Sequence, residues 1–177
     1  EFRRVLFRSL KFNTTGYNNT AVGNNANPLN TFGVNNTSLG ASALAANTTN
    51  SNNTAIGGQA LYSSTADNLT AIGYQALYSN TTGGTSTAVE YRTLYSATTG
   101  INNTAVGYQA LWNTTFGGSN TAVGYPTLST NVSGSANTAV GSGALQNATA
   151  SNLTAIGYQA LYSNTTGTYN ESVGYQA

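Results

Sequence analysis

A short motif of alternating polar and apolar residues, typified by Thr-Ala-Val-Gly, recurs along almost the whole of this 177-residue chain. Its ten copies begin at Thr20, Thr37, Thr54, Thr70, Thr87, Thr104, Thr121, Thr138, Thr154 and Glu171. Neighbouring copies are 17 residues apart in seven cases and 16 residues apart in two. Such a constant short period is typical of solenoid proteins, in which each repeat stacks on the one before it.

The first half of each unit alternates with a period of two. Counted from the Thr, the third position is Val, Ile or Leu, the fifth is often Tyr, the seventh is usually Ala and the ninth is often aromatic. This alternation predicts an extended strand, and apolar residues on both faces are typical of a strand covered on two sides. The second half, with the consensus Ser-Asn-Thr-Thr-Gly, has the composition of turns. Helix is excluded because these residues have low helix propensity and show no 3.6-residue period.

We therefore expect an all-β, parallel β-solenoid of about ten rungs of 16 or 17 residues, spanning residues 20–177 and preceded by a partial repeat at 10–19. Both 16-residue units end in Asn-Leu, at Asn68-Leu69 and Asn152-Leu153, so we place the missing residue in the turn. The chain stops inside its tenth unit, which predicts a segment of a longer array, truncated at both ends.

Residues 1–9, EFRRVLFRS, share no composition with the repeats. They can be back-translated to GAG TTC AGA CGT GTG CTC TTC CGA TCT, which matches a common sequencing-library adapter. We interpret residues 1–9 as a read-through artefact and exclude them from the fold reasoning. The alternative is a short basic amphipathic arm.

Stacking equal units in register places equivalent residues about 4.7–4.9 Å apart, so each position of the unit becomes a column. We expect the aliphatic third position to form the core, together with a column of Leu. The aliphatic column is Val22, Leu39, Ile56, Ile72, Val89, Val106, Val123, Val140, Ile156 and Val173. The Leu column is Leu29, Leu44, Leu61, Leu77, Leu94, Leu111, Leu128, Leu145 and Leu161. A single rung buries too little apolar area to offset the ordering of its residues, so we expect a second apolar face to lie against other chains.

Gly fills the fourth position of every unit but one, which predicts a corner that needs positive φ or close backbone approach. The exception is Glu90. There we expect the corner to open to water and Arg92 to form a surface ion pair of little energetic weight.

The composition argues against several classes of function. Asn, Thr, Ser and Gly number 25, 29, 17 and 20, charged residues are 5% of the chain, and His, Cys and Met are absent. Beyond residue 12 the only charged residues are Arg92, Asp67, Glu90 and Glu171, a net charge of −2 that does not suit nucleic acid. The three acids fall in different units and no nucleophile has a base beside it in the repeat, so we expect no enzyme, cofactor or metal site. No stretch has the roughly 20 apolar residues of a membrane helix.

The segments NNTAVGYQAL and TAIGYQAL resemble the head repeats of trimeric autotransporter adhesins (YadA-like head, or Hep-Hag, repeats). The resemblance implies a left-handed β-roll built from three identical chains. It implies an extracellular rod, anchored to the outer membrane of a bacterium, that attaches to a host protein or glycan through multivalent contacts. NTAVGYQAL arrays are also similar to bacteriophage tail fibres, which gives a fibre shaft on a virion as the alternative.

Two aromatic columns are the candidate contact residues. One, at the fifth position, is Tyr74, Tyr91, Tyr108, Tyr125, Tyr158 and Tyr175; the other, at the ninth, is Tyr62, Tyr78, Tyr95, Trp112 and Tyr162. We select the second column as the candidate partner-contact site, because Tyr and Trp give large contact areas at low entropic cost. The alternative is a stacked ladder that stiffens the rod or fills the space between chains.

A third functional class is ice binding, which a regular Thr array on a flat solenoid face suggests. Ice binding requires paired ranks of outward side chains. The repeat supplies one constant Thr rank beside an aliphatic rank that we expect to point inward.

Overall fold

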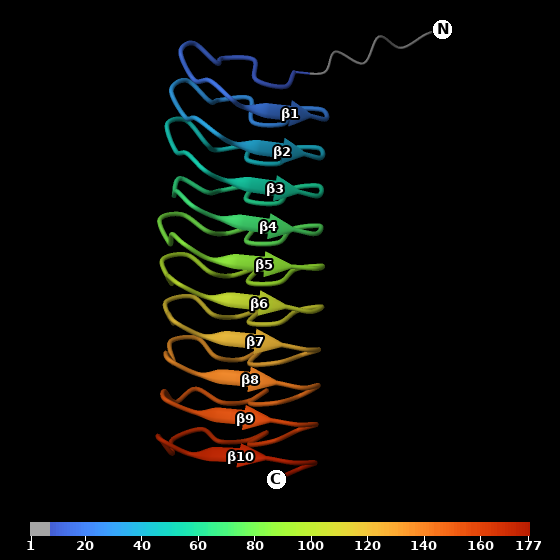
Figure 1. Ribbon diagram of the computed structural model, residues 1–177, viewed down its shortest axis with the longest axis vertical. Helices are drawn as coiled ribbons and strands as arrows, with labels where there is room; N and C mark the ends of the chain where they lie inside the picture. Colours follow the sequence, from blue (N-terminus) through green and yellow to red (C-terminus); the bar gives the residue numbers. More distant parts are fainter. Residues whose placement is uncertain (1–7) are drawn as a thin grey trace, which may run out of the picture.

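Ten parallel strands, stacked in chain order, form the computed structural model, which describes residues 8–177 (Figure 1). The strands are β1 (Thr20–Val22), β2 (Thr37–Leu39), β3 (Thr54–Ile56), β4 (Thr70–Ile72), β5 (Thr87–Val89), β6 (Thr104–Val106), β7 (Thr121–Val123), β8 (Thr138–Val140), β9 (Thr154–Ile156) and β10 (Glu171–Val173). All ten belong to one sheet in which sequence neighbours are hydrogen-bonded. The predicted parallel β-solenoid is confirmed. Residues 1–7, most of the segment assigned to the adapter, lie outside the described residues.

The sheet register joins equivalent residues of successive rungs. Val106 is paired with Val123 across a 17-residue unit. Thr54 is paired with Thr70 across a 16-residue unit, so the strands keep their alignment where the unit is shorter. The missing residue is therefore absorbed in the turn, as predicted.

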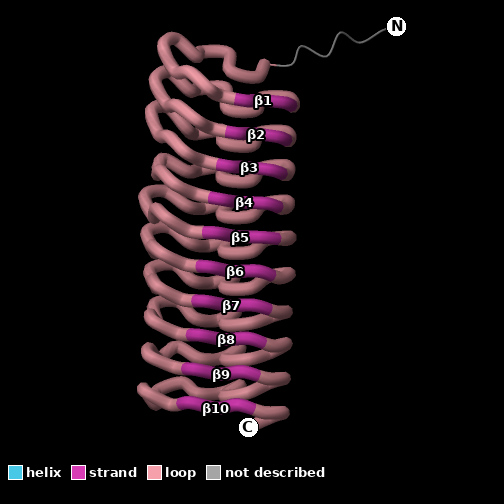
Figure 2. Tube along the Cα trace, viewed as in Figure 1, coloured by secondary structure: helices cyan, strands magenta, loops and turns pink. Residues whose placement is uncertain are grey.

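The strand of each rung is three residues long, which corrects the longer extended segment that the period of two predicted. In Figure 2 the strands form one narrow magenta band and the remainder of each rung is loop. The strand ends because left-handed residues follow it, for example Gln109 at φ 56° and Leu111 at φ 52°. Ala110 and Leu111 are adjacent and both buried, which a single extended strand would not allow.

The turns behind the strands still form a ladder between rungs. The N–H of Leu111 donates to the carbonyl oxygen of Thr127 at 3.0 Å, and the N–H of Asn113 donates to that of Ser129 at 3.0 Å. Each rung is thus hydrogen-bonded to its neighbours on both sides of a narrow interior. This two-sided bonding satisfies backbone groups that the short strands alone would leave buried and unpaired.

The interior is filled by Ala and Leu. The middle residue of β3 to β9 is a buried Ala, and the Leu column is buried from Leu44 to Leu145. The prediction that the aliphatic third position forms the core is wrong: Val22 is 55% and Val123 38% exposed. Because side chains alternate along a strand, one inward Ala leaves both its flanking residues pointing outward. The inward Ala side chains and the Leu column form one buried cluster that fills the interior.

The first rung corrects one member of the Leu column. Asn27, not Leu29, lies seven residues after Thr20, and it is buried with a left-handed φ of 43°. Its N–H donates to the carbonyl oxygen of Ala43 at 2.8 Å, the bond that Leu makes in later rungs. Leu29 is 42% exposed. Leu29 was included in the Leu column because of its residue type, although its distance from the strand differs from that of the other members.

The Gly column forms the predicted corner. Gly107 has a φ of 129°, and a Cβ atom there would lie 2.6 Å from the carbonyl oxygen of Gly124. Glu90 takes this position with φ reduced to 98° and its side chain exposed, as expected of a corner open to water. The Glu90–Arg92 ion pair is not formed. Instead, the Nε of Arg92 donates to Oε1 of Gln75 at 2.7 Å.

A column of buried Asn connects successive turns. Asn120, directly before β7, accepts the N–H of Asn137 through Oδ1 at 3.0 Å. Its Nδ2 donates to the carbonyl oxygen of Gly134 at 2.9 Å. Asn36, Asn53 and Asn103 each direct the same pair of bonds to the following turn. Each Asn of this Asn ladder therefore satisfies two buried backbone groups of the next rung.

Replacement of Asn120 by Ala leaves the Asn137 N–H buried without a partner. It also removes one of the two hydrogen bonds to the Gly134 carbonyl oxygen, which still accepts from Nδ2 of Asn131 at 2.9 Å. We expect Asn120→Ala to lower the free energy of unfolding by about 2–4 kcal/mol. The control is Asn113→Ala, because the Asn113 side chain makes no hydrogen bond to another described residue; its cost should stay below about 1 kcal/mol. Urea unfolding followed by circular dichroism measures both. Equal losses would show that the ladder contributes no stability of its own.

Candidate functional site

The outward side chains of the sheet form a flat two-column surface, which we call the strand face: the first and third residues of β1 to β10. One column is Thr except at Glu171, and the other is entirely aliphatic. Seven of the ten aliphatic residues are exposed and the other three are partly buried. Glu171 is the single ionisable residue on this face. The strand face is therefore a long, nearly uncharged surface that alternates hydroxyl and hydrocarbon groups.

The fifth-position aromatics, here called the corner column, follow the Gly corner and are largely exposed. Five of the six rings are exposed, from 42% for Tyr108 to 74% for Tyr175, and Tyr91 is partly buried. Tyr91 and Tyr108 stack with ring centroids 5.1 Å apart and planes 8° from parallel, whereas Tyr125 meets Tyr108 edge-on at 75°. Ser142 interrupts the column before Tyr158. Rings one rung apart thus pack against each other from Tyr74 to Tyr125, and again at Tyr158 and Tyr175.

The ninth-position aromatics, here called the back column, are the predicted contact residues. The structure places them partly buried on the segment behind the strands. Tyr62, Tyr78 and Tyr95 form a parallel stack, with centroids 5.1 and 5.2 Å apart and planes 7° and 8° from parallel. Trp112 lies on the next rung, and its Nε1 is buried without a hydrogen-bond partner among the described residues. Ser129 and Gln146 occupy the next two rungs of the column and separate Tyr162 from the others. Partner contact by these five residues stays a prediction.

Between the two aromatic columns runs a row of polar side chains that the sequence analysis did not identify. Nε2 of Gln75 donates to Oε1 of Gln59 at 2.8 Å. Arg92 occupies this row in the fifth rung, where its guanidinium carbon lies 5.2 Å from the Tyr91 ring centroid and 5.3 Å from that of Tyr95. Arg92 therefore joins the corner column to the back column. The recurrence of Gln at the sixth position of the unit was the available signal.

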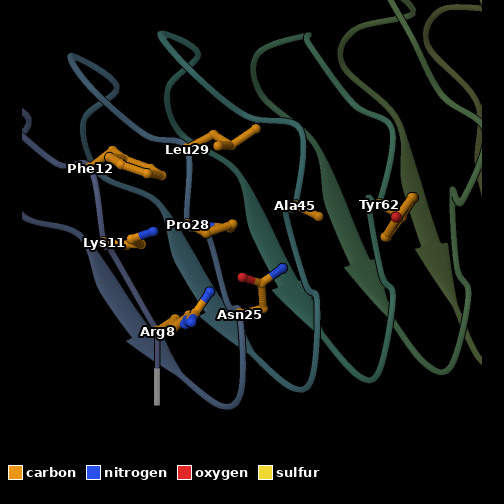
Figure 3. A pocket seen from close by; sticks show the side chains of 8 residues that line it. All are labelled: Arg8, Lys11, Phe12, Asn25, Pro28, Leu29, Ala45 and Tyr62. Atoms are coloured by element: carbon orange, nitrogen blue, oxygen red, sulfur yellow. The ribbon is translucent and has the colours of Figure 1, made fainter. Parts of the chain in front are cut away.

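A hollow interrupts the back column at its N-terminal side (Figure 3). It has a volume of about 360 Å³ and is lined by Arg8, Lys11, Phe12, Asn25, Pro28, Leu29, Ala45 and Tyr62. An adjoining part of about 260 Å³ is lined by Leu29, Ala45, Ala46, Tyr62 and Ser63. The hollow exists because Ala45 stands where the next three rungs carry Tyr. A small residue directly before three consecutive Tyr residues of the column was the available signal in the sequence.

The described residues hold few groups for chemistry. In residues 8–177 there is no cluster of three or more His, Cys, Asp or Glu side chains that could hold a metal ion. No helix in that range is both long and apolar enough to cross a bilayer.

Stability should respond differently to loss of a stacked and of an exposed ring. Tyr78 is covered on both faces, so we expect Tyr78→Ala to lower the free energy of unfolding by about 2–3 kcal/mol. Tyr158 is 43% exposed and stacks on Tyr175, so Tyr158→Ala should cost about 1 kcal/mol. Thermal and urea unfolding compare the two variants. A neutral Tyr78→Ala would rule out a stiffening role for the back column.

Comparison of the chain with protein-family models, with curated proteins and with solved structures finds no match to any of them.

Proposed function

We propose that this chain is an extracellular fibrous repeat module, an adhesin head that attaches to a host or cell surface through multivalent contacts. Its strand face is buried against identical chains in a homotrimer, and its aromatic columns remain on the outside for contact with a protein or glycan. The observation that carries the proposal is the outward orientation of the aliphatic column along the whole rod.

The strand face has the properties of an interface between copies. Soluble monomers rarely expose continuous apolar patches of more than a few hundred Å². Ten rungs at about 4.8 Å make this face roughly 45 Å long. Its two columns repeat at one-rung intervals, so identical copies can pack side by side with all ranks aligned. The nearly complete absence of charge removes the usual barrier to such packing.

The proposed number of chains and the proposed placement of the rod on a cell surface rest on the resemblance to autotransporter head repeats. A trimer encloses the three strand faces at its centre. The chain reverses direction at the Gly corner after each strand (Figure 1), so the back column lies on the side away from the strand face. Weak contacts made by the aromatic residues of several rungs then add along the rod. The same rod on a virion, as a bacteriophage tail fibre shaft, is the alternative placement.

A charge on the strand face should dissociate the oligomer. Val123 is exposed within one chain, so Val123→Asp should leave the fold intact and convert an oligomer into an 18.2 kDa monomer. The control is Val132→Asp, since Val132 is 45% exposed in a turn outside the strand face. Analytical ultracentrifugation gives the mass of each variant. Adhesion of protein-coated beads to cultured epithelial cells should fall with Val123→Asp and not with Val132→Asp.

A monomeric parent chain at micromolar concentration would contradict the buried strand face. Trimer formation without any cell adhesion would instead contradict the adhesive role and leave the assembly standing.

Ice binding is a second candidate, because one specific observation now favours it. The sequence argument against it assumed that the aliphatic rank points inward, whereas that rank points outward beside the Thr rank. A free strand face would thus present paired ranks of hydroxyl and methyl groups that repeat every 4.7–4.9 Å.

The two candidates compete for one surface, so a single measurement separates them. If the chain is an ice-binding monomer, it should show thermal hysteresis, and Val123→Asp should abolish it while Val132→Asp should not. A stable trimer without hysteresis would exclude ice binding by this face.

A further inference from the structure

The Tyr stack of the back column ends with an uncovered ring face. Tyr62 has Tyr78 against one face at a centroid distance of 5.1 Å. The equivalent residue of the preceding rung is Ala45, and that of the rung before is Pro28. Figure 3 shows the three in one row, with the Tyr62 ring at one end of the row and the small Ala45 side chain next to it. One position of the stack is therefore vacant.

The vacancy has the dimensions of one six-membered ring. Successive rungs are about 4.8 Å apart, which is close to the centroid separation of the Tyr rings. A ring inserted level with Ala45 would thus continue the stack at the spacing that the Tyr side chains already adopt. The part of the hollow lined by Leu29, Ala45, Ala46, Tyr62 and Ser63 has a volume of about 260 Å³. This volume is below the usual range of sites for drug-sized ligands, about 300–1,000 Å³, as expected of a site for a single small ring.

The lining of the vacancy combines an aromatic face with uncharged polar groups. Leu29 and Ala45 supply apolar surface beside the Tyr62 ring, and Ser63 lines the same space. The Asn25 side chain enters the larger hollow with its amide oxygen and nitrogen directed into it (Figure 3). An aromatic face beside hydroxyl and amide groups suits a ligand with one hydrocarbon face and a rim of hydroxyls.

We propose that this hollow binds a single neutral hexopyranose, whose C–H face stacks on Tyr62 at the level of Ala45 and whose hydroxyl groups face Asn25 and Ser63. The part lined by Leu29, Ala45, Ala46, Tyr62 and Ser63 carries no charged side chain, which favours a neutral sugar. The charged residues Arg8 and Lys11 line the larger part of the hollow and not the part beside Ser63. This proposal deepens the proposed adhesive function by naming a sugar ring as the ligand, and it rests on that function for its biological use.

The test is saturation-transfer NMR and titration of the full chain with methyl β-D-glucopyranoside, methyl β-D-galactopyranoside and N-acetyl-D-glucosamine, with phenol as a planar aromatic probe. One stacking face should give a dissociation constant on the order of 1–10 mM for at least one sugar.

Ala45→Tyr fills the vacancy without removing any group, so it should abolish binding while the melting temperature stays equal or rises. Tyr62→Ala should weaken binding about tenfold or more. Tyr169→Ala removes the same side chain at a position that is 79% exposed and lies outside the hollow and outside both aromatic columns, so it should leave binding unchanged.

The outcomes separate this proposal from the one on which it rests, because the titration requires neither adhesion nor a trimer. Absence of sugar binding up to about 50 mM overturns the hollow as a sugar site, even if the rod adheres to cells. Binding that survives Ala45→Tyr, or binding of phenol alone, overturns it as well. Sugar binding that Ala45→Tyr abolishes supports it, even if adhesion by the rod fails.

Discussion

Hydrogen bonding between equivalent residues of successive rungs is the constraint on which the rest of this structure depends. Because the register never shifts, every side chain has its own equivalents above and below it. Tyr therefore meets Tyr, Asn meets Asn and Gln meets Gln, as in the stack at Tyr78, the ladder at Asn120 and the row at Gln75. Like-on-like contact suits aromatic rings and amides, which attract their own kind. It excludes runs of like charge, which agrees with a composition of 5% charged residues.

Because of this constraint, some features of the fold can be predicted from the sequence and others cannot. The period, the number of rungs, the register and the Gly corner follow from spacing alone, and the structure has each as predicted. Which side of a strand faces inward does not follow from spacing. Ala and Val are both apolar, and the choice between them is decided by the distance to the opposite wall, which only the closed rung defines. The partial burial of Tyr62 and its neighbours depends on that closure too.

The extended segment was predicted to be longer than three residues because left-handed residues leave the sequence pattern of polar and apolar side chains unchanged. Leu111 has a left-handed backbone that a bulky side chain seldom adopts, yet it repeats at each rung as regularly as any strand residue. A binary pattern records which side chains are buried and not which backbone conformation buries them. The positions that break the columns carry information of another kind. Ala45, Glu90 and Ser142 each interrupt a column, and a hollow of about 360 Å³ lies at the first of them.

The Asn ladder gives the rod a direction. Each amide reaches from an earlier residue to a later turn, as Asn120 does to Gly134 and Asn137, so the acceptor and donor for a new turn are in place before that turn exists. A ribosome releases the chain in the same order. Every newly synthesised turn therefore emerges onto a finished surface that already holds its hydrogen-bonding partners, and the rod can lengthen during translation without waiting for its distal end.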